Sequence, residues 1–181
     1  MQNPEFARLI AERRSVRPKA QLPAAPSDEV LEAAVRAARS APSHNPAYPV
    51  RFVKVVSRGK LADVFEKALP ADADQTMRER ARSKALKGAC CIVVIGPKPQ
   101  ADWPRFMDME NLLTAGGALT NFLNVLWAEG IGAMTLTTRE ITDPEGLFDP
   151  KTERLLAFVL CGEMGERPEP RPETASLLSV W

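Results

Sequence analysis

The longest continuous helix that the sequence predicts covers residues 106–127. Its second half, residues 116–127, is apolar around most of its circumference. A membrane span needs about 20 mostly apolar residues, and Asn111, Asn121 and Asn124 interrupt this one, so we interpret it as a buried helix. A helix that is apolar on all sides must be covered on all sides. A chain of 181 residues has few other helices for this, which favours a second subunit as the cover, as does a tail that ends in apolar residues.

Four glycines mark the middle and the end of this helix. Inside a helix, Gly116 and Gly117 each cost about 1 kcal/mol relative to alanine, so a partner helix or a flat ligand is expected to approach them, and the partner helix is favoured. Gly130 predicts a left-handed cap, with Gly132 at the start of the next strand. Because the glycine pair is short and follows a helix rather than a strand, a Rossmann dinucleotide site is excluded.

Two unbroken apolar segments, residues 89–95 and 155–161, predict strands that are covered on both faces. Cys90 and Cys91 would then point to opposite faces as core residues. Strands and helices interleave, so the chain predicts one α/β or α+β domain over residues 1–181. Two further strands are expected at residues 50–56 and 133–138, and helices at residues 6–13, 27–38, 61–69 and 77–87, with a short one that begins at Asp143-Pro144-Glu145.

The composition excludes several classes of function. Lys and Arg number 24 against 23 Asp and Glu, a net charge of +1 that gives no footprint for nucleic acid or an anionic membrane. Three cysteines make no disulfide framework and indicate a reducing compartment, so we expect a cytoplasmic protein; the N-terminus does not read as a secretion signal. A single histidine, His44, argues against a histidine metal site or a catalytic triad. The chemistry is therefore expected to come from a bound molecule.

Three short segments could bind that molecule. Arg13, Arg14, Ser15 and Arg17 combine three guanidinium groups and a hydroxyl, which suit a phosphate. The alternative is a solvated basic helix end, which composition alone favours. Ser43-His44-Asn45 lies between two prolines, where His44 could donate to a ligand or to its own turn. For Arg167 and Arg171 in the proline-rich tail, solvent is the default and a ligand phosphate the alternative.

In their order along the chain, these motifs resemble the nitroreductase family of FMN-dependent oxidoreductases. The family pattern has an Arg-Arg-Ser-x-Arg entry, a helix, and an Ala-Pro-Ser-x-Asn-x-x-Pro-Trp loop that leads into a strand; residues 12–17 and 41–52 match it. Residues 128–133, Cys161-Gly162 and the Arg-Pro tail that closes on Trp181 extend the match over nearly the whole chain. The length and His44 are most similar to the short, single-domain branch.

The resemblance implies an α+β fold, with a mixed or antiparallel sheet flanked by helices, in an intertwined homodimer. Two FMN molecules would lie at the subunit interface, and residues 163–181 would extend onto the partner. NAD(P)H would reduce FMN and leave, and a nitroaromatic or quinone would then take the same site, with no catalytic side chain and no metal. The residues implied to bind FMN are Arg13, Arg14, Ser15 and Arg17 at the phosphate and ribityl chain, Ser43, His44 and Asn45 near the flavin, Thr135, Leu136 and Thr137 along it, and Arg171 at the phosphate.

The chain departs from the family pattern at several positions. The short branch often has Trp-Arg-Ser where this chain has Thr135-Leu136-Thr137, and Val50 stands in place of the tryptophan at the strand entry. Glu169 stands where some relatives carry a cation. These changes bear on substrate stacking and on FMN affinity. The missing Trp-Arg pair favours one alternative, a flavin-binding or sensing homologue with little turnover. A structural dimer whose arginines are solvated is a further alternative.

Overall fold

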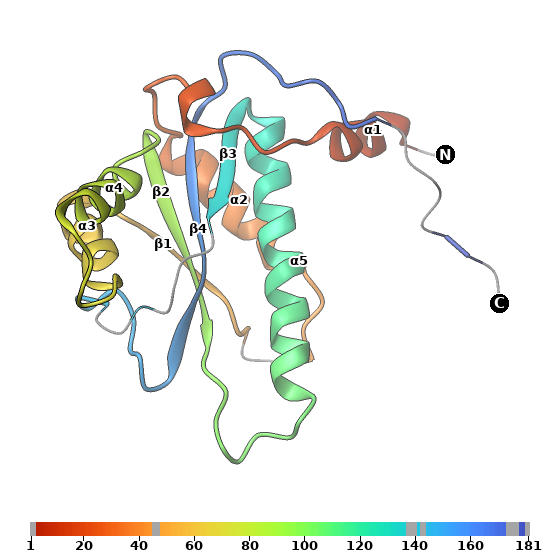
Figure 1. Ribbon diagram of the computed structural model, residues 1–181. Helices are drawn as coiled ribbons and strands as arrows, with labels where there is room; N and C mark the ends of the chain where they lie inside the picture. Colours follow the sequence, from red (N-terminus) through yellow and green to blue (C-terminus); the bar gives the residue numbers. More distant parts are fainter. Residues whose placement is uncertain (1–2, 45–47, 137–140, 142–143, 173–177, 180–181) are drawn as a thin grey trace.

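The computed structural model describes residues 3–44, 48–136, 141, 144–172 and 178–179 of the 181-residue chain. Figure 1 shows the strands side by side, with the longest helix beside them. The elements are, in chain order, helix α1 (Pro4–Glu12), a 3-10 turn (Pro18–Ala20), α2 (Asp28–Ala38), β1 (Arg51–Lys54), α3 (Arg58–Lys67), α4 (Gln75–Ala85), β2 (Cys90–Pro97), α5 (Met107–Ala128), β3 (Ile131–Leu136) and β4 (Glu153–Glu163).

The four strands form one sheet in the order β1-β2-β4-β3, and all three pairings are antiparallel. The α+β prediction is confirmed, and the sheet is antiparallel rather than mixed. The two apolar segments of the sequence became the central strands β2 and β4, which pair with Cys90 opposite Cys161. Strand β3 lies at one edge of the sheet, with Met134 opposite Leu160.

Helices cover both faces of the sheet, which gives the molecule two apolar cores (Figure 1). On one face α2 and α5 pack on the strands, and Phe122 stacks on Phe52 with ring centroids 4.8 Å apart. Helices α3 and α4 lie on the other face, where the rings of Phe65 and Phe158 pack with their centroids 4.9 Å apart. Alternate residues of a strand point to opposite faces, and so Cys90 belongs to the first core and Cys91 to the second, as predicted.

Capping residues fix where the helices begin and end. Ser27 accepts a hydrogen bond from the Val30 backbone, and Asp74 does the same for the Met77 backbone. Gly130 follows α5 with a φ of 72°, the left-handed cap that was predicted. The short helix expected after Asp143 was wrong over the described residues: residues 144–150 form turns, and Glu145 has a φ of 50°, which no right-handed helix allows.

Helix α5 is covered on one side only within a single chain. The side chains of Phe106, Met109, Leu112 and Leu113 are 54%, 59%, 45% and 70% exposed, so a single chain does not cover this helix on all sides, as expected, and its cover by a second subunit stays a prediction. Gly117 is approached by Ala41 of the same chain, whose Cβ lies 3.2 Å from the position a glycine Cβ would take, while Gly116 faces open space. Among the described helices, none is long and apolar enough to cross a membrane.

Candidate functional site

The segment of residues 13–17 runs beside the beginning of β3. The backbone N–H of Val16 donates to the carbonyl of Ala133 at 2.9 Å, and the Gln21 side chain donates to the carbonyl of Val16 at the same distance. Gly132 makes this approach possible: a Cβ there would lie 2.8 Å from Cγ1 of Val16. Val16 is 2% exposed. The apolar residue in the middle of the segment thus anchors the arginines on both sides of it to the edge of the sheet.

Three arginines gather at this edge, and we call them the arginine cluster: Arg13, Arg14 and Arg171. Burial lowers the pKa of Arg13, and the charges of Arg171 and Arg14 lower it further. None of the ion pairs within the described ranges involves a member of the cluster. The Nη1 atom of Arg14 is buried and has no hydrogen-bond partner in that same part of the chain. Mutual repulsion and an unsatisfied buried donor both favour an anion at this place.

The tail that carries Arg171 crosses the end of α5. The guanidinium of Arg167 lies over the ring of Trp127, 5.1 Å from its centroid. Figure 1 shows the chain after β4 running over the end of the sheet toward α1. Arg167 thus holds the tail four residues before Arg171 and helps to bring the C-terminal arginine to the N-terminal pair.

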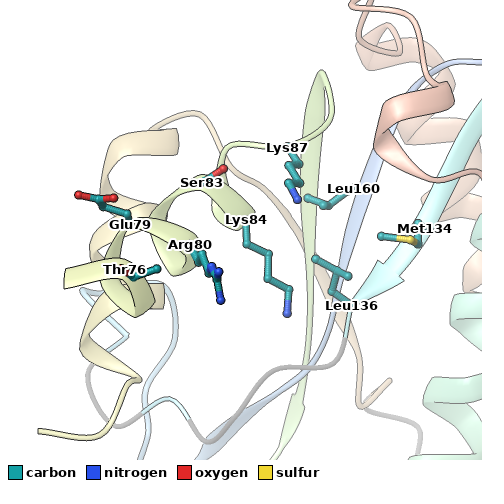
Figure 2. A pocket seen from close by; sticks show the side chains of 9 residues that line it. All are labelled: Thr76, Glu79, Arg80, Ser83, Lys84, Lys87, Met134, Leu136 and Leu160. Atoms are coloured by element: carbon teal, nitrogen blue, oxygen red, sulfur yellow. The ribbon is translucent and has the colours of Figure 1, made fainter. Parts of the chain in front are cut away.

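A groove of about 610 Å³ lies between α4 and the edge of the sheet (Figure 2). Its floor is apolar, formed by Met134, Leu136 and Leu160. One wall comes from α4 and the residues that follow it, and the lining there is polar: Thr76, Glu79, Arg80, Ser83, Lys84 and Lys87. A flat, partly anionic molecule fits this combination of an apolar floor and a basic wall.

The groove adjoins the segment that carries the arginine cluster. A Cβ on Gly88, next to Lys87, would lie 3.2 Å from Oε1 of Gln21 and 3.3 Å from Cβ of Leu160. On β3, Val16 covers Gly132, which is two residues before Met134. Because alternate residues of a strand share a face, Gly132 and Met134 lie on the same side of the sheet. The cluster and the groove therefore follow one another along the same edge of the sheet.

The cations of α4 divide between two sides of the helix. Arg82 pairs with Asp63 and Glu66 of α3 at 2.6 and 2.8 Å, and Arg78 lies 3.7 Å from Glu66. Arg80, Lys84 and Lys87 line the groove instead, at a spacing that places them along one side. Within the described residues these three cations form no ion pair, and we call them the groove cations. Figure 2 shows Lys84 extended toward the sheet and Arg80 farther from it, near Thr76.

Of the three residues predicted along the flavin, the structure places Leu136 on the floor of the groove. Thr135 is exposed and belongs to the alternate set of β3 side chains, which points to the other side of the sheet. Thr137 lies outside the described residues. Ser15 and Arg17 are both exposed and flank Val16, beside the arginine cluster. Their predicted roles remain predictions.

The loop with Ser43 and His44 lies far from the groove in the single chain. It follows α2 and rests against α5, where the hydroxyl of Thr114 donates to the carbonyl of Pro42 at 2.8 Å. Helices α2 and α5 cover one face of the sheet, and the groove opens on the other. Ser43 and His44 are exposed, and Asn45 lies outside the described residues. One chain thus brings the arginines to the groove but leaves this loop apart from them.

Sequence reasoning missed the groove cations. It predicted a charged helix over residues 77–87 without separating its sides. Cations at positions 80, 84 and 87 follow the i, i+4, i+7 spacing of one helix side, and this signal could have found them. In the described part of the chain, no three His, Cys, Asp or Glu side chains form a group suited to a metal ion.

Comparisons with known proteins agree on one family. The sequence pattern of the nitroreductase family matches residues 10–163. No curated protein sequence matches the chain significantly. A nitroreductase-like family protein from Bacillus cereus superimposes with a TM-score of 0.79 at 21% identity, covering 94% of this chain and 91% of that one.

Two further structures have bound ligands. A nitroreductase from Bacteroides fragilis with bound FMN has a TM-score of 0.70 at 21% identity and covers 98% of both chains. The NADPH:FMN oxidoreductase from Vibrio harveyi in complex with NAD+ has a TM-score of 0.69 at 18% identity, covering 93% of this chain and 72% of that one. At these identities, the likeness shows the fold.

Proposed function

Because the chain belongs to the nitroreductase family, we propose that it is an FMN-dependent oxidoreductase. It would transfer hydride from NAD(P)H through FMN to a small aromatic acceptor, a nitroaromatic or a quinone, by a two-step exchange. The observation that carries this proposal is the arginine cluster with its unsatisfied Arg14 Nη1, next to a groove with an apolar floor. The Bacteroides fragilis relative binds FMN and the Vibrio harveyi relative binds NAD+, which supports both molecules as ligands.

The residues present fit FMN. Its phosphate needs several convergent donors and positive charge, which Arg13, Arg14 and Arg171 would supply, with Ser15 and Arg17 beside them. The ring system would lie over Met134 and Leu136, the apolar floor of the groove.

When bound, FMN supplies the hydride chemistry. The side chains of the groove would hold the ring, keep water from the floor and leave one side open to the exchanging substrates. This division of work explains how the chain could be an enzyme with a single histidine.

A second copy of the chain would complete the site. Met109 and Leu113 of α5 are exposed, and α1 has no buried residue, with Phe6 61% exposed. Figure 1 shows α1 projecting away from the sheet, with the described part of the tail up to residue 172 running toward it, as elements that embrace a partner do. In a homodimer, the partner's loop with Ser43, His44 and Asn45 would reach the flavin that its own chain does not approach, and residues 163–181 would cross to the partner. The functional unit is then the dimer.

A second candidate is a flavin-binding or sensing protein with little turnover. The stretch Thr135-Leu136-Thr137, which replaces the Trp-Arg-Ser frequent in the short branch, favours it, because an aromatic and a cation are absent there. A third candidate, the structural dimer, leaves the buried unsatisfied Nη1 of Arg14 without a role.

An absorption spectrum tests the proposal directly. Purified protein is expected to be yellow or to take up FMN, and NADH or NADPH is expected to bleach it anaerobically. Steady-state oxidation of NAD(P)H with a quinone separates the enzyme from the sensing homologue. Changing Arg14 and Ser15 to alanine is expected to lower the FMN content; unchanged content would contradict the phosphate role, and protein that takes up no FMN would refute the proposal.

A further inference from the structure

The charge of the groove exceeds what one FMN phosphate requires. The three residues of the arginine cluster already match a phosphate dianion at one end of the site. The groove cations add three more positive charges, and none of them has a carboxylate partner in the part of the chain that the structure describes. This surplus indicates that a second anionic group enters the groove.

Arg80 is the groove cation farthest along α4 from the arginine cluster. Lys87 follows α4, at the end where Gly88 and Gln21 meet, whereas Arg80 is five residues before the last residue of the helix, Ala85, about 8 Å along the helix axis. One small anion cannot contact both ends. The phosphate end and the Arg80 end are therefore separate sites for negative charge.

None of the described side chains that line the groove forms an ion pair with Arg80. Glu79 is the only acidic residue among the described lining residues, and Figure 2 shows its carboxylate pointing away from Arg80 and from the groove. The Glu79 carboxylate accepts instead from Nε2 of Gln75, at 2.9 Å. The Arg80 guanidinium thus lines the groove without a carboxylate partner among the described residues.

We propose that the electron acceptor of this protein is an aromatic acid, and that Arg80 binds its carboxylate. The inference rests on the proposed function, because it places the acceptor over the flavin in the same groove. A guanidinium binds a carboxylate by two parallel hydrogen bonds, and the apolar floor accepts the aromatic ring. Arg80 is a specificity residue in this scheme: it contacts the substrate and takes no part in hydride transfer.

A matched pair of acceptors tests the inference. Initial rates with 4-nitrobenzoate and 4-nitrobenzamide compare a carboxylate with a neutral group of the same shape. Arg80→Gln removes the cation, and Arg78→Gln is the control, because it removes the same charge from the side of α4 that faces α3. The FMN-loaded protein is expected to prefer the benzoate by about tenfold or more in kcat/KM, and Arg80→Gln to abolish the preference through KM, whereas Arg78→Gln keeps it.

Calorimetric titration of the oxidised, FMN-loaded protein with benzoate and benzamide gives a readout that needs no turnover. Benzoate is expected to bind more tightly than benzamide, and Arg80→Gln to make the two equal. Equal use of both acceptors by an active wild type would overturn the inference and leave the proposed function intact. The inference would also be overturned if Arg80→Gln raised only the KM for NAD(P)H, since Arg80 would then bind the diphosphate of that donor. Protein that takes up no FMN and oxidises no NAD(P)H would overturn both proposals.

Discussion

Arg13 and Arg171 lie near enough to one another that the charge of Arg171 lowers the pKa of Arg13, although they come from opposite ends of the chain. Two like charges held together with a third, on Arg14, oppose folding unless an anion joins them. The fold accepts this repulsion at the edge of the sheet, where the Val16 backbone fixes the N-terminal segment and Arg167 holds the tail.

Arg171→Gln is expected to weaken FMN binding by about tenfold to a hundredfold, because a charge-assisted hydrogen bond contributes about 1.5–3 kcal/mol. The FMN-free protein should melt at the same or a slightly higher temperature, since one repulsive charge is gone. FMN titration monitored by flavin fluorescence and a thermal melt measure the two effects. Arg36→Gln, in an exposed i,i+4 pair with Glu32 on α2, is the control for charge alone; equal losses in both variants would contradict a local role for Arg171.

Gly132→Ala tests whether the approach of the N-terminal segment to β3 matters. Its Cβ would lie 2.8 Å from Cγ1 and 2.9 Å from Cβ of Val16, and Val16 is buried, so the segment must shift. We expect a loss of about 1–3 kcal/mol in the free energy of unfolding, together with weaker FMN binding.

Gly59→Ala is the matched control, since nothing lies within 4 Å of a Cβ there and α3 accepts alanine. Chemical denaturation compares the two variants. A Gly132→Ala protein as stable as the Gly59→Ala protein would show that the segment is free to move.

Leu113→Glu tests the dimer. Leu113 is 70% exposed on α5, and a charge there should separate the subunits if this face is the interface. The wild type is expected to scatter light as about twice the chain mass of 19.9 kDa, and the variant as a single chain. Val56→Glu, which changes an 88% exposed residue between β1 and α3, should leave the mass unchanged. A dimeric Leu113→Glu protein would place the interface elsewhere.

The Arg51–Glu153 ion pair sets an acid limit to stability. Two hydrogen bonds of 2.6 and 2.8 Å from Arg51 lower the pKa of Glu153 to about 2, and the Asp149 N–H adds a third. A lowered carboxyl pKa stabilises the fold above the unfolded-state pKa, about 4.3, and this contribution disappears as the pH falls toward 2.

Glu153→Gln should therefore lower stability at pH 7 by about 1 kcal/mol, as an exposed pair does, and flatten the decline between pH 4.5 and 2. Denaturant unfolding across this range measures the slope. Glu29→Gln, an exposed carboxyl at the start of α2, should keep the wild-type slope. Identical slopes in all three proteins would mean that the pair does not form in solution.

Most of the fold could be predicted from local patterns. The short apolar runs around Val93 and Phe158 are fully buried only as central strands of a sheet, and Gly130 allows the cap that ends α5. The turns after Pro144 could not be predicted this way, because a proline and two acids satisfy the rules for a helix start whether or not a helix follows. Tertiary contacts, which local patterns do not contain, decide such cases.

The candidate site was harder to predict. The motif around Arg13 and Arg14 pointed to the arginine cluster, but the cations of α4 face either α3 or the groove, and a helix of 11 residues with four basic side chains does not reveal by itself which side is which. The ion-pair partners on α3 distinguish the two sides of the helix. Asp63 and Glu66 pair with Arg78 and Arg82, whereas Arg80 and Lys84 line the groove.

Because the two sets of cations lie on different sides of α4, each side can be substituted without affecting the other. Changes at position 80 alter the groove without touching the contacts that attach the helix to α3, and changes at position 82 do the opposite. A lineage could thus exchange one acceptor for another by single substitutions on an element whose attachment stays constant. Libraries randomised at positions 76, 80 and 84 should keep a high fraction of folded members, which makes this helix the natural place to redirect the specificity of the protein.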